Sequence, residues 1–173
     1  MPGWPFSASR ANKDADLLLA QVAKASRNPA FFGEGRASDT LQGRFEMMAA
    51  HATLALLRLR QAPEAEPLAQ AFVDALFRHL DHGLREHGIG DLAVPKRMHK
   101  LAGAFYGRAN AYAAALAGPD PAELAAALQR DVAGTSGAFA AALARHMCDL
   151  ATAQAAAPWE RLLTSDGWAP FAG

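Results

Sequence analysis

Cysteine is nearly absent from this sequence: Cys148 is the only one among 173 residues. A disulfide within the chain is therefore excluded, and such low cysteine usage is typical of a reducing, cytoplasmic compartment. The first residues, Met1 to Phe6, do not form a basic segment followed by a long apolar core, so we expect no signal peptide. They also lack the longer Arg-rich stretch of a mitochondrial presequence. These absences predict a cytoplasmic location.

An excess of charge of either sign is also missing, since 17 basic residues balance 17 acidic ones. A general binder of nucleic acid or of anionic membranes is usually clearly basic, so any such contact needs a local patch. No run of about 18 consecutive apolar residues occurs, which argues against a membrane-spanning helix. Aromatic residues make up only 8% of the chain, although 51% is hydrophobic. Much of that share is alanine, which favours helices.

Helix boundary signals divide the chain at regular intervals. Asp39 is expected to cap a helix with Gln42 at the capping-box position, and Asp120 followed by Pro121 and Glu123 predicts another helix start. No alternation typical of strands is present at useful length. The predicted fold class is all-α, with one domain, residues 1–173, built as a bundle of about six helices with short loops. The expected helices span residues 9–27, 40–61, 67–87, 95–117, 121–132 and 138–156, and residues 1–8 and 165–173 are expected to be irregular tails.

A metal site is the sharpest chemical alternative. His79 and His82 lie three residues apart on one predicted helix, and imidazole with nearby carboxylates suits zinc or iron. The pattern is not His-Glu-x-x-His, and no Glu-x-x-His motif repeats on a second helix, so a solvated outer face is the favoured interpretation. No Gly-x-Ser-x-Gly elbow and no glycine-rich phosphate loop followed by lysine occur. We therefore predict no catalytic residue, no metal and no cofactor, with a metal-dependent or haem-handling protein as the alternative.

Positive charge is concentrated in the predicted fourth helix. From Lys96 to Arg108 there is no acidic residue, Arg97 adds a further cation, and Lys96, Lys100 and Arg108 fall on one side of the helix. A basic strip is as often a solvated face as a binding surface. A ribosome- or RNA-associated adaptor that uses residues 96–108 is therefore a second alternative, against which the neutral overall charge argues.

Small and aromatic residues accompany this charge. Gly103 and Gly107 leave one strip of the helix flat, either for a partner or for tight packing inside the bundle. Tyr106 places an amphipathic ring beside Phe105. Together with the Gly-Ile-Gly-Asp corner at residues 88–91, these residues indicate a surface shaped for a partner.

The same region resembles the ubiquinol–cytochrome c chaperone family. The matching motifs are Leu84-Arg85-Glu86-His87-Gly88-Ile89-Gly90-Asp91-Leu92, Pro95-Lys96-Arg97-Met98 and Ala104-Phe105-Tyr106-Gly107-Arg108, preceded by Pro29-Phe31-Phe32, Asp39-Thr40-Leu41 and Arg44-Phe45. The resemblance covers about residues 26–112. His87, Ala93 and Gly103 depart from residues that are common in the family.

The resemblance implies a non-enzymatic assembly chaperone. It would bind newly made cytochrome b and assist assembly of the ubiquinol–cytochrome c reductase complex, respiratory complex III. Mitochondrial relatives also work near the ribosomal exit and pair with a small helical partner, and bacterial relatives are expected to act at the inner membrane as peripheral proteins. The expected contact residues are Leu84, Arg85, Gly88, Gly90, Asp91, Lys96, Arg97, Lys100, Phe105, Tyr106 and Arg108, with Asp39, Arg44 and Phe45 as a secondary motif.

Overall fold

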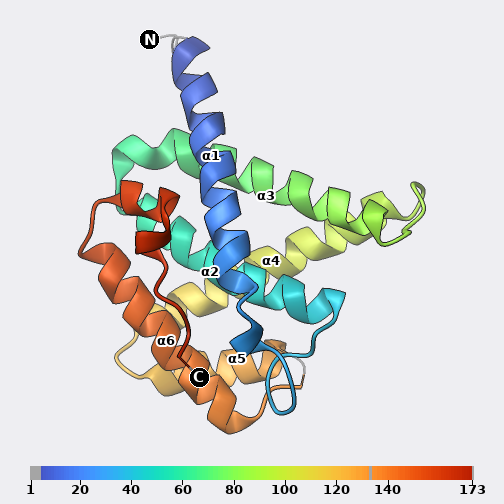
Figure 1. Cartoon of the computed structure of the whole chain (residues 1–173), viewed down its shortest axis with the longest axis vertical. Helices are drawn as coiled ribbons and strands as arrows, with labels where there is room; N and C mark the ends of the chain where they lie inside the picture. The colour runs from blue at the N-terminus through green and yellow to red at the C-terminus, as the bar shows by residue number, and fades with distance from the viewer. Residues whose placement is uncertain (1–4, 133, 173) are drawn as a thin grey trace.

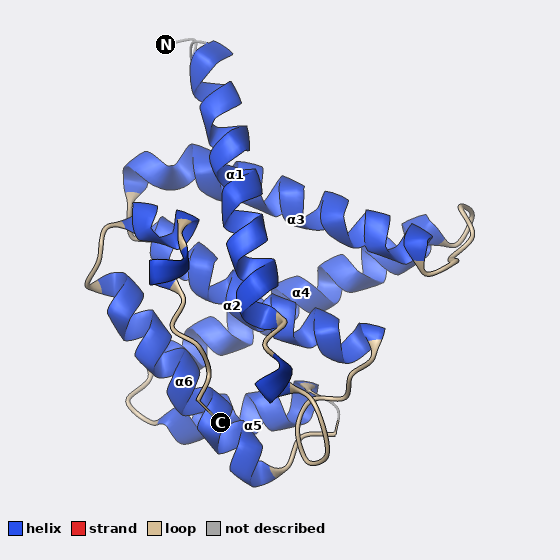
Figure 2. Ribbon diagram, viewed as in Figure 1, coloured by secondary structure: helices blue, strands red, loops and turns tan. Residues whose placement is uncertain are grey.

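Helices form the framework of the molecule. The computed structural model describes residues 5–132 and 134–172, and within these ranges there is no strand (Figure 2). The α-helices of this part are α1 (Pro5–Ser26), α2 (Leu41–Arg60), α3 (Glu66–Glu86), α4 (Val94–Ala117), α5 (Pro121–Asp131) and α6 (Gly137–Ala155). Shorter 3₁₀ turns are η1 (Pro29–Phe31), η2 (Pro63–Ala65), η3 (Trp159–Leu163) and η4 (Ser165–Gly167). The all-α prediction is confirmed.

Side chains cap the starts of α2, α5 and α6, and at α2 the capping residue differs from the predicted one. Thr40, and not Asp39, caps α2, since its hydroxyl oxygen accepts a hydrogen bond from the Gly43 N–H at 3.1 Å. Asp39 instead accepts a hydrogen bond from Arg44 Nε at 2.8 Å. Asp120 caps α5 as predicted, because its carboxylate accepts from the backbone N–H of the second helical residue.

The first expected tail is helical from residue 5, whereas the second has the expected lack of regular structure over residues 168–172 but is packed against the bundle. α1 already begins at Pro5, so residues 5–8 are helical, while residues 1–4 lie outside the described residues. At the other end the chain forms η4 and then buries Trp168 and Phe171. The indole N–H of Trp168 donates to the Leu162 carbonyl oxygen at 3.0 Å, and the Phe171 ring stacks on Phe31 at 4.9 Å between centroids. Aromatic burial therefore holds this segment against the bundle.

The central element is α2, whose residues 45–56 are all buried. One side of α2, including Phe45 and Met48, packs with α1 and α3 in a first hydrophobic cluster. The other side, including Met47 and Leu54, packs with α5 and α6 in a second cluster. A helix that is buried on every side belongs in a core, and the many alanines of α2 allow neighbours to approach it from both directions.

The helices α3 and α4 contact each other and meet at the corner formed by residues 87–93. Figure 1 shows this corner projecting at one edge of the molecule, at the right of the view. None of the described helices is apolar enough over a sufficient length to span a bilayer.

Candidate partner-binding cleft

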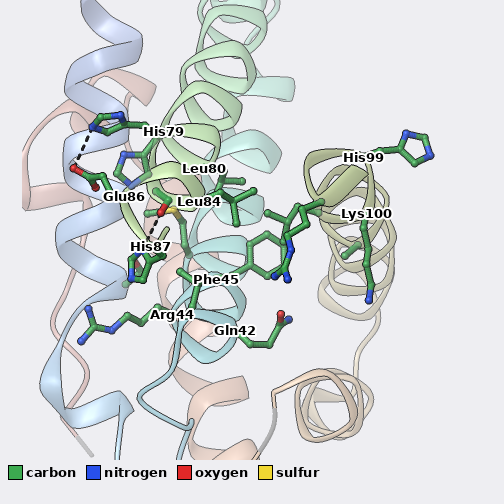
Figure 3. Close-up of a pocket in the computed structure, with 18 of the residues that line it drawn as sticks. Gln42, Arg44, Phe45, His79, Leu80, Leu84, Glu86, His87, His99 and Lys100 are labelled. Atoms are coloured by element: carbon green, nitrogen blue, oxygen red, sulfur yellow. Dashed lines mark hydrogen bonds and ion pairs between the residues drawn. The ribbon is translucent and has the colours of Figure 1, made fainter. Parts of the chain in front are cut away.

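A cleft of about 1250 Å³ lies between the end of α1, the first half of α2, the second half of α3 and the first half of α4. Figure 3 shows Phe45 and Leu84 on one side of this hollow and Lys100 on the facing side, on α4. Its apolar lining consists of Leu41, Phe45, Met48, Leu80, Leu84, Ala93, Leu101 and Ala104. Small-molecule sites usually have volumes of about 300–1,000 Å³, so the size suits a segment of polypeptide.

Basic side chains dominate the polar lining, and we call this hollow the basic cleft. Within the described part of the chain its only acidic lining residue is Glu86, which forms an ion pair with His82 (Nε2–Oε1, 3.2 Å). The Lys and Arg residues that line it are Arg27, Arg44, Lys96, Arg97, Lys100 and Arg108. The predicted placement of Lys96, Lys100 and Arg108 on one side of α4 is confirmed.

Arg108 differs from the other cations of the cleft. Its guanidinium donates two hydrogen bonds to the carboxylate of Glu46 on α2, one of them from Nη2 to Oε1 at 2.7 Å. The Glu46 side chain has no exposed surface, whereas that of Arg108 is 20% exposed. Burial raises the pKa of the Glu46 carboxyl, and the Arg108 bonds oppose that rise. Arg108 is thus not part of an exposed basic strip but ties α4 to α2.

The secondary motif of the sequence reaches the same cleft. Arg44 lines it while remaining exposed and bonded to Asp39, and this bond lowers the pKa of the Asp39 carboxyl. Phe45 is only 6% exposed and has the Arg108 guanidinium carbon 5.8 Å from its ring centroid. Two motifs more than 40 residues apart in the chain therefore meet at one place.

Two of the expected contact residues are buried. Phe105 is 1% exposed and packs edge to face on Phe77 of α3 at 5.7 Å between centroids, so its ring supports the α3–α4 contact instead of facing a partner. Leu84 is 5% exposed and contributes to the apolar wall of the cleft. Tyr106 is 48% exposed.

The corner after α3 is held by its backbone. Gly88 has φ +77°, the left-handed conformation that glycine adopts readily just after the end of a helix. The N–H of Ile89 donates to the Leu84 carbonyl at 3.2 Å, and the N–H of Gly88 donates to the Arg85 carbonyl at 3.0 Å. These are the two bonds of a Schellman motif, which ends a helix without leaving carbonyls unsatisfied.

Side chains reinforce this corner. Arg85 donates to Asp81 on α3 at 2.8 Å and to Asp91 in the loop at 2.5 Å. The Gly90 carbonyl accepts from Ala93 N–H at 2.8 Å, which starts the turn into α4. Arg85, Gly88, Gly90 and Asp91 thus shape the corner, and none of them lines the cleft. Beyond them Leu92 is fully exposed.

The glycines inside α3 and α4 face open space and are not packed against neighbouring helices. A Cβ at Gly103 or Gly107 would meet no atom within 4 Å, so tight packing inside the bundle is not the reason for either glycine. Gly83, which sequence reasoning missed, lines the cleft one turn from His79 and one turn from His87, and a Cβ there would also meet nothing within 4 Å. Gly83 could have been noticed in the sequence, because a glycine inside a helix destabilises the helix by about 1 kcal/mol relative to alanine.

The histidines of α3 do not assemble a metal site. His79 is half-buried, and burial, with the charge of Arg27 adding to it, lowers the pKa of its imidazole. His82 faces Glu86 on the same helix. Across residues 5–132 and 134–172 no three His, Cys, Asp or Glu side chains are grouped as ligands for a metal ion. The lining of the cleft is thus mixed, partly apolar and partly cationic.

The fold and this site define the class of the protein: it is all-helical and has a cleft large enough for a segment of polypeptide. The family model of ubiquinol-cytochrome C chaperones matches residues 34–166, and the chain belongs to this family. The crystal structure of the Cbp3 homolog from Brucella abortus is similar, with a TM-score of 0.79 and 36% sequence identity over 95% of this chain and 92% of that chain. No curated protein matches the chain.

Proposed function

We propose that this protein is a non-enzymatic assembly chaperone that binds newly made cytochrome b in the basic cleft. By holding the client until it is passed on, it would assist assembly of the ubiquinol–cytochrome c reductase complex. A small helical partner, a ribosome contact and peripheral contact with the inner membrane belong to the same proposal.

The convergence of the family-like motifs on one cleft is the observation that carries this proposal. Arg44 and Phe45 come from α2, Leu84 from α3, and Lys96 and Arg97 from α4, yet all of them line the same hollow. Residues that served only to stabilise the fold would have no reason to share one open surface.

The chemistry of the cleft also suits an unassembled membrane protein. Such a client exposes apolar helices, and covering apolar surface is favourable by about 25 cal/mol per Å². An RNA-binding role is less favoured, because the basic side chains surround an apolar lining that a phosphate backbone would not use.

Filling the cleft tests the proposal. Gly83→Leu would add a side chain at the lining of the cleft, where a Cβ meets no atom within 4 Å, and leucine favours helix more than glycine does. Gly103→Leu is the matched control, since this glycine is also inside a helix with an open Cβ position but does not line the cleft. Tagged variants would be expressed in the native host at normal levels, crosslinked gently and purified.

We expect Gly103→Leu to retain cytochrome b and Gly83→Leu to lose it, with both variants as helical as the parent by circular dichroism. The same purification identifies any small partner or ribosomal protein. Cytochrome b recovered equally with both variants would place client binding outside the cleft, and its absence from the parent sample would overturn the proposed client.

A further inference from the structure

The lining of the basic cleft is strongly cationic, whereas the chain as a whole has a formal net charge of zero. Basic and acidic residues are equal in number in the whole sequence. Among the residues that line the cleft, however, Lys and Arg prevail, and Glu86 is the only acid within the described ranges. A cleft that bound apolar surface alone would gain nothing from this imbalance, because desolvating unpaired charges opposes binding.

Most of these cations have no partner inside the protein. Arg108 is paired with Glu46 and Arg44 with Asp39. In the part of the chain that the structure describes, four cleft cations form no ion pair: Arg27, Lys96, Arg97 and Lys100. They come from α4 and from the residue after α1, so an occupant would meet free positive charge from two elements of the fold.

We infer that the occupant of the basic cleft is an apolar helical segment that carries carboxylates. The inference rests on the proposed function and names the chemistry by which the client would be recognised. Lys96 and Lys100 are one helical turn apart, which matches two acidic residues one turn apart on a helix. An extended segment would bring unpaired backbone N–H and C=O groups to the apolar wall, whereas a helix satisfies them internally.

Peptides matched in all but charge test this inference with the full-length protein. Three labelled helical peptides of about 18 residues, five turns, would share one apolar face and differ at two positions one turn apart, occupied by Glu, Gln or Lys. Binding would be followed by fluorescence anisotropy at low salt. We expect the affinity order Glu, Gln, Lys, with about tenfold between the first and the last, equivalent to about 1.4 kcal/mol. The difference should shrink as salt screens the charges.

Variants of the protein assign the preference to the cleft. Lys96→Glu with Lys100→Glu should reverse the order of the peptides, while Gly83→Leu should weaken all three. Arg60→Glu is the charge control, because Arg60 is an exposed cation at the end of α2 that does not line the cleft. This variant should preserve the order.

Equal affinity for the three peptides, with loss in Gly83→Leu, would overturn the carboxylate inference and leave the cleft as an apolar client site. No peptide binding, or tighter binding of single-stranded RNA than of the Glu peptide, would overturn it as well. None of these three results bears on the proposed function. That function fails only if cytochrome b is not recovered with the parent protein or if its recovery is unaffected by Gly83→Leu.

Discussion

Arg108 has two roles: it lies on the basic side of α4, and it pairs with the buried carboxylate of Glu46. Its position three turns from Lys96 placed it on the basic side of α4, which the structure confirms. What spacing could not reveal is the carboxylate facing it, because Glu46 lies 62 residues earlier, in the buried part of α2. A lone acid in a buried run is the signal that could have pointed to an internal partner.

Removal of the Arg108 side chain should destabilise the fold strongly. Arg108→Ala leaves the Glu46 carboxylate buried without its partner, and breaking such a pair costs about 3 kcal/mol. Urea unfolding should show this loss, whereas Lys100→Ala, which removes an exposed cation on the same helix, should change the free energy of unfolding by less than about 0.5 kcal/mol. Similar values for the two variants would mean that the buried pair contributes little.

His51 couples stability to pH. Burial lowers the pKa of its imidazole from 6.5 to about 4, against the opposing effect of the bond between Nδ1 and the Met47 carbonyl oxygen at 2.7 Å. Since the folded pKa lies below the unfolded one, the neutral imidazole contributes stability that is full above pH 6.5 and is lost as pH falls towards 4.

Between about pH 7.5 and pH 5, His51 alone should therefore lower the free energy of unfolding by about 2 kcal/mol. In His51→Gln, this part of the pH dependence should disappear even if the variant is less stable at every pH. Urea titrations at both pH values measure the difference. Parallel pH profiles for the parent and the variant would show that another group is responsible.

At the scale of the elements, local signals predicted the helices well. The Gly-Ile-Gly-Asp corner, the Asp120 cap and the proline positions all mark boundaries within a few residues of those observed. The start of α2 was misassigned because Asp39 and Thr40 are both good capping residues. Arg44 engages the Asp39 carboxylate, which leaves the Thr40 hydroxyl to bond the Gly43 N–H. The side-chain partner five residues away decides between them.

The corner between α3 and α4 offers a test of backbone conformation by itself. Gly88→Ala should destabilise the protein by about 1 kcal/mol, because a side chain disfavours φ +77°. Gly90→Ala should be nearly neutral, since this glycine has no positive φ and a Cβ there would meet no atom within 4 Å. Thermal unfolding of the two variants makes the comparison. Equal losses would indicate that the corner tolerates a side chain at either position.

At the scale of the whole molecule, the sequence predicted the fold class but not the basic cleft. Helical periodicity assigns residues to helix faces, and Phe45 and Met48, three residues apart, do lie on the side of α2 that packs with α1 and α3. A cleft depends on which helices lie beside one another, and that depends on long-range packing. The C-terminal segment was missed for the same reason, since Trp168 and Phe171 are held by contacts with α2 and η1 and by no local repeat.

The position of that segment sets when the first hydrophobic cluster can be completed during protein synthesis. Every residue that lines the cleft lies between positions 26 and 108, yet Phe45 and Met48 belong to the hydrophobic cluster that Leu162 and Trp168 complete. Translation proceeds at about 5–20 residues per second, so the 60 residues from 108 to 168 take roughly 3–12 s. Through that interval the residues that line the cleft have been synthesised, but the hydrophobic cluster to which Phe45 and Met48 belong still lacks Leu162 and Trp168. A nascent copy of this protein therefore completes this cluster only after Trp168 has emerged.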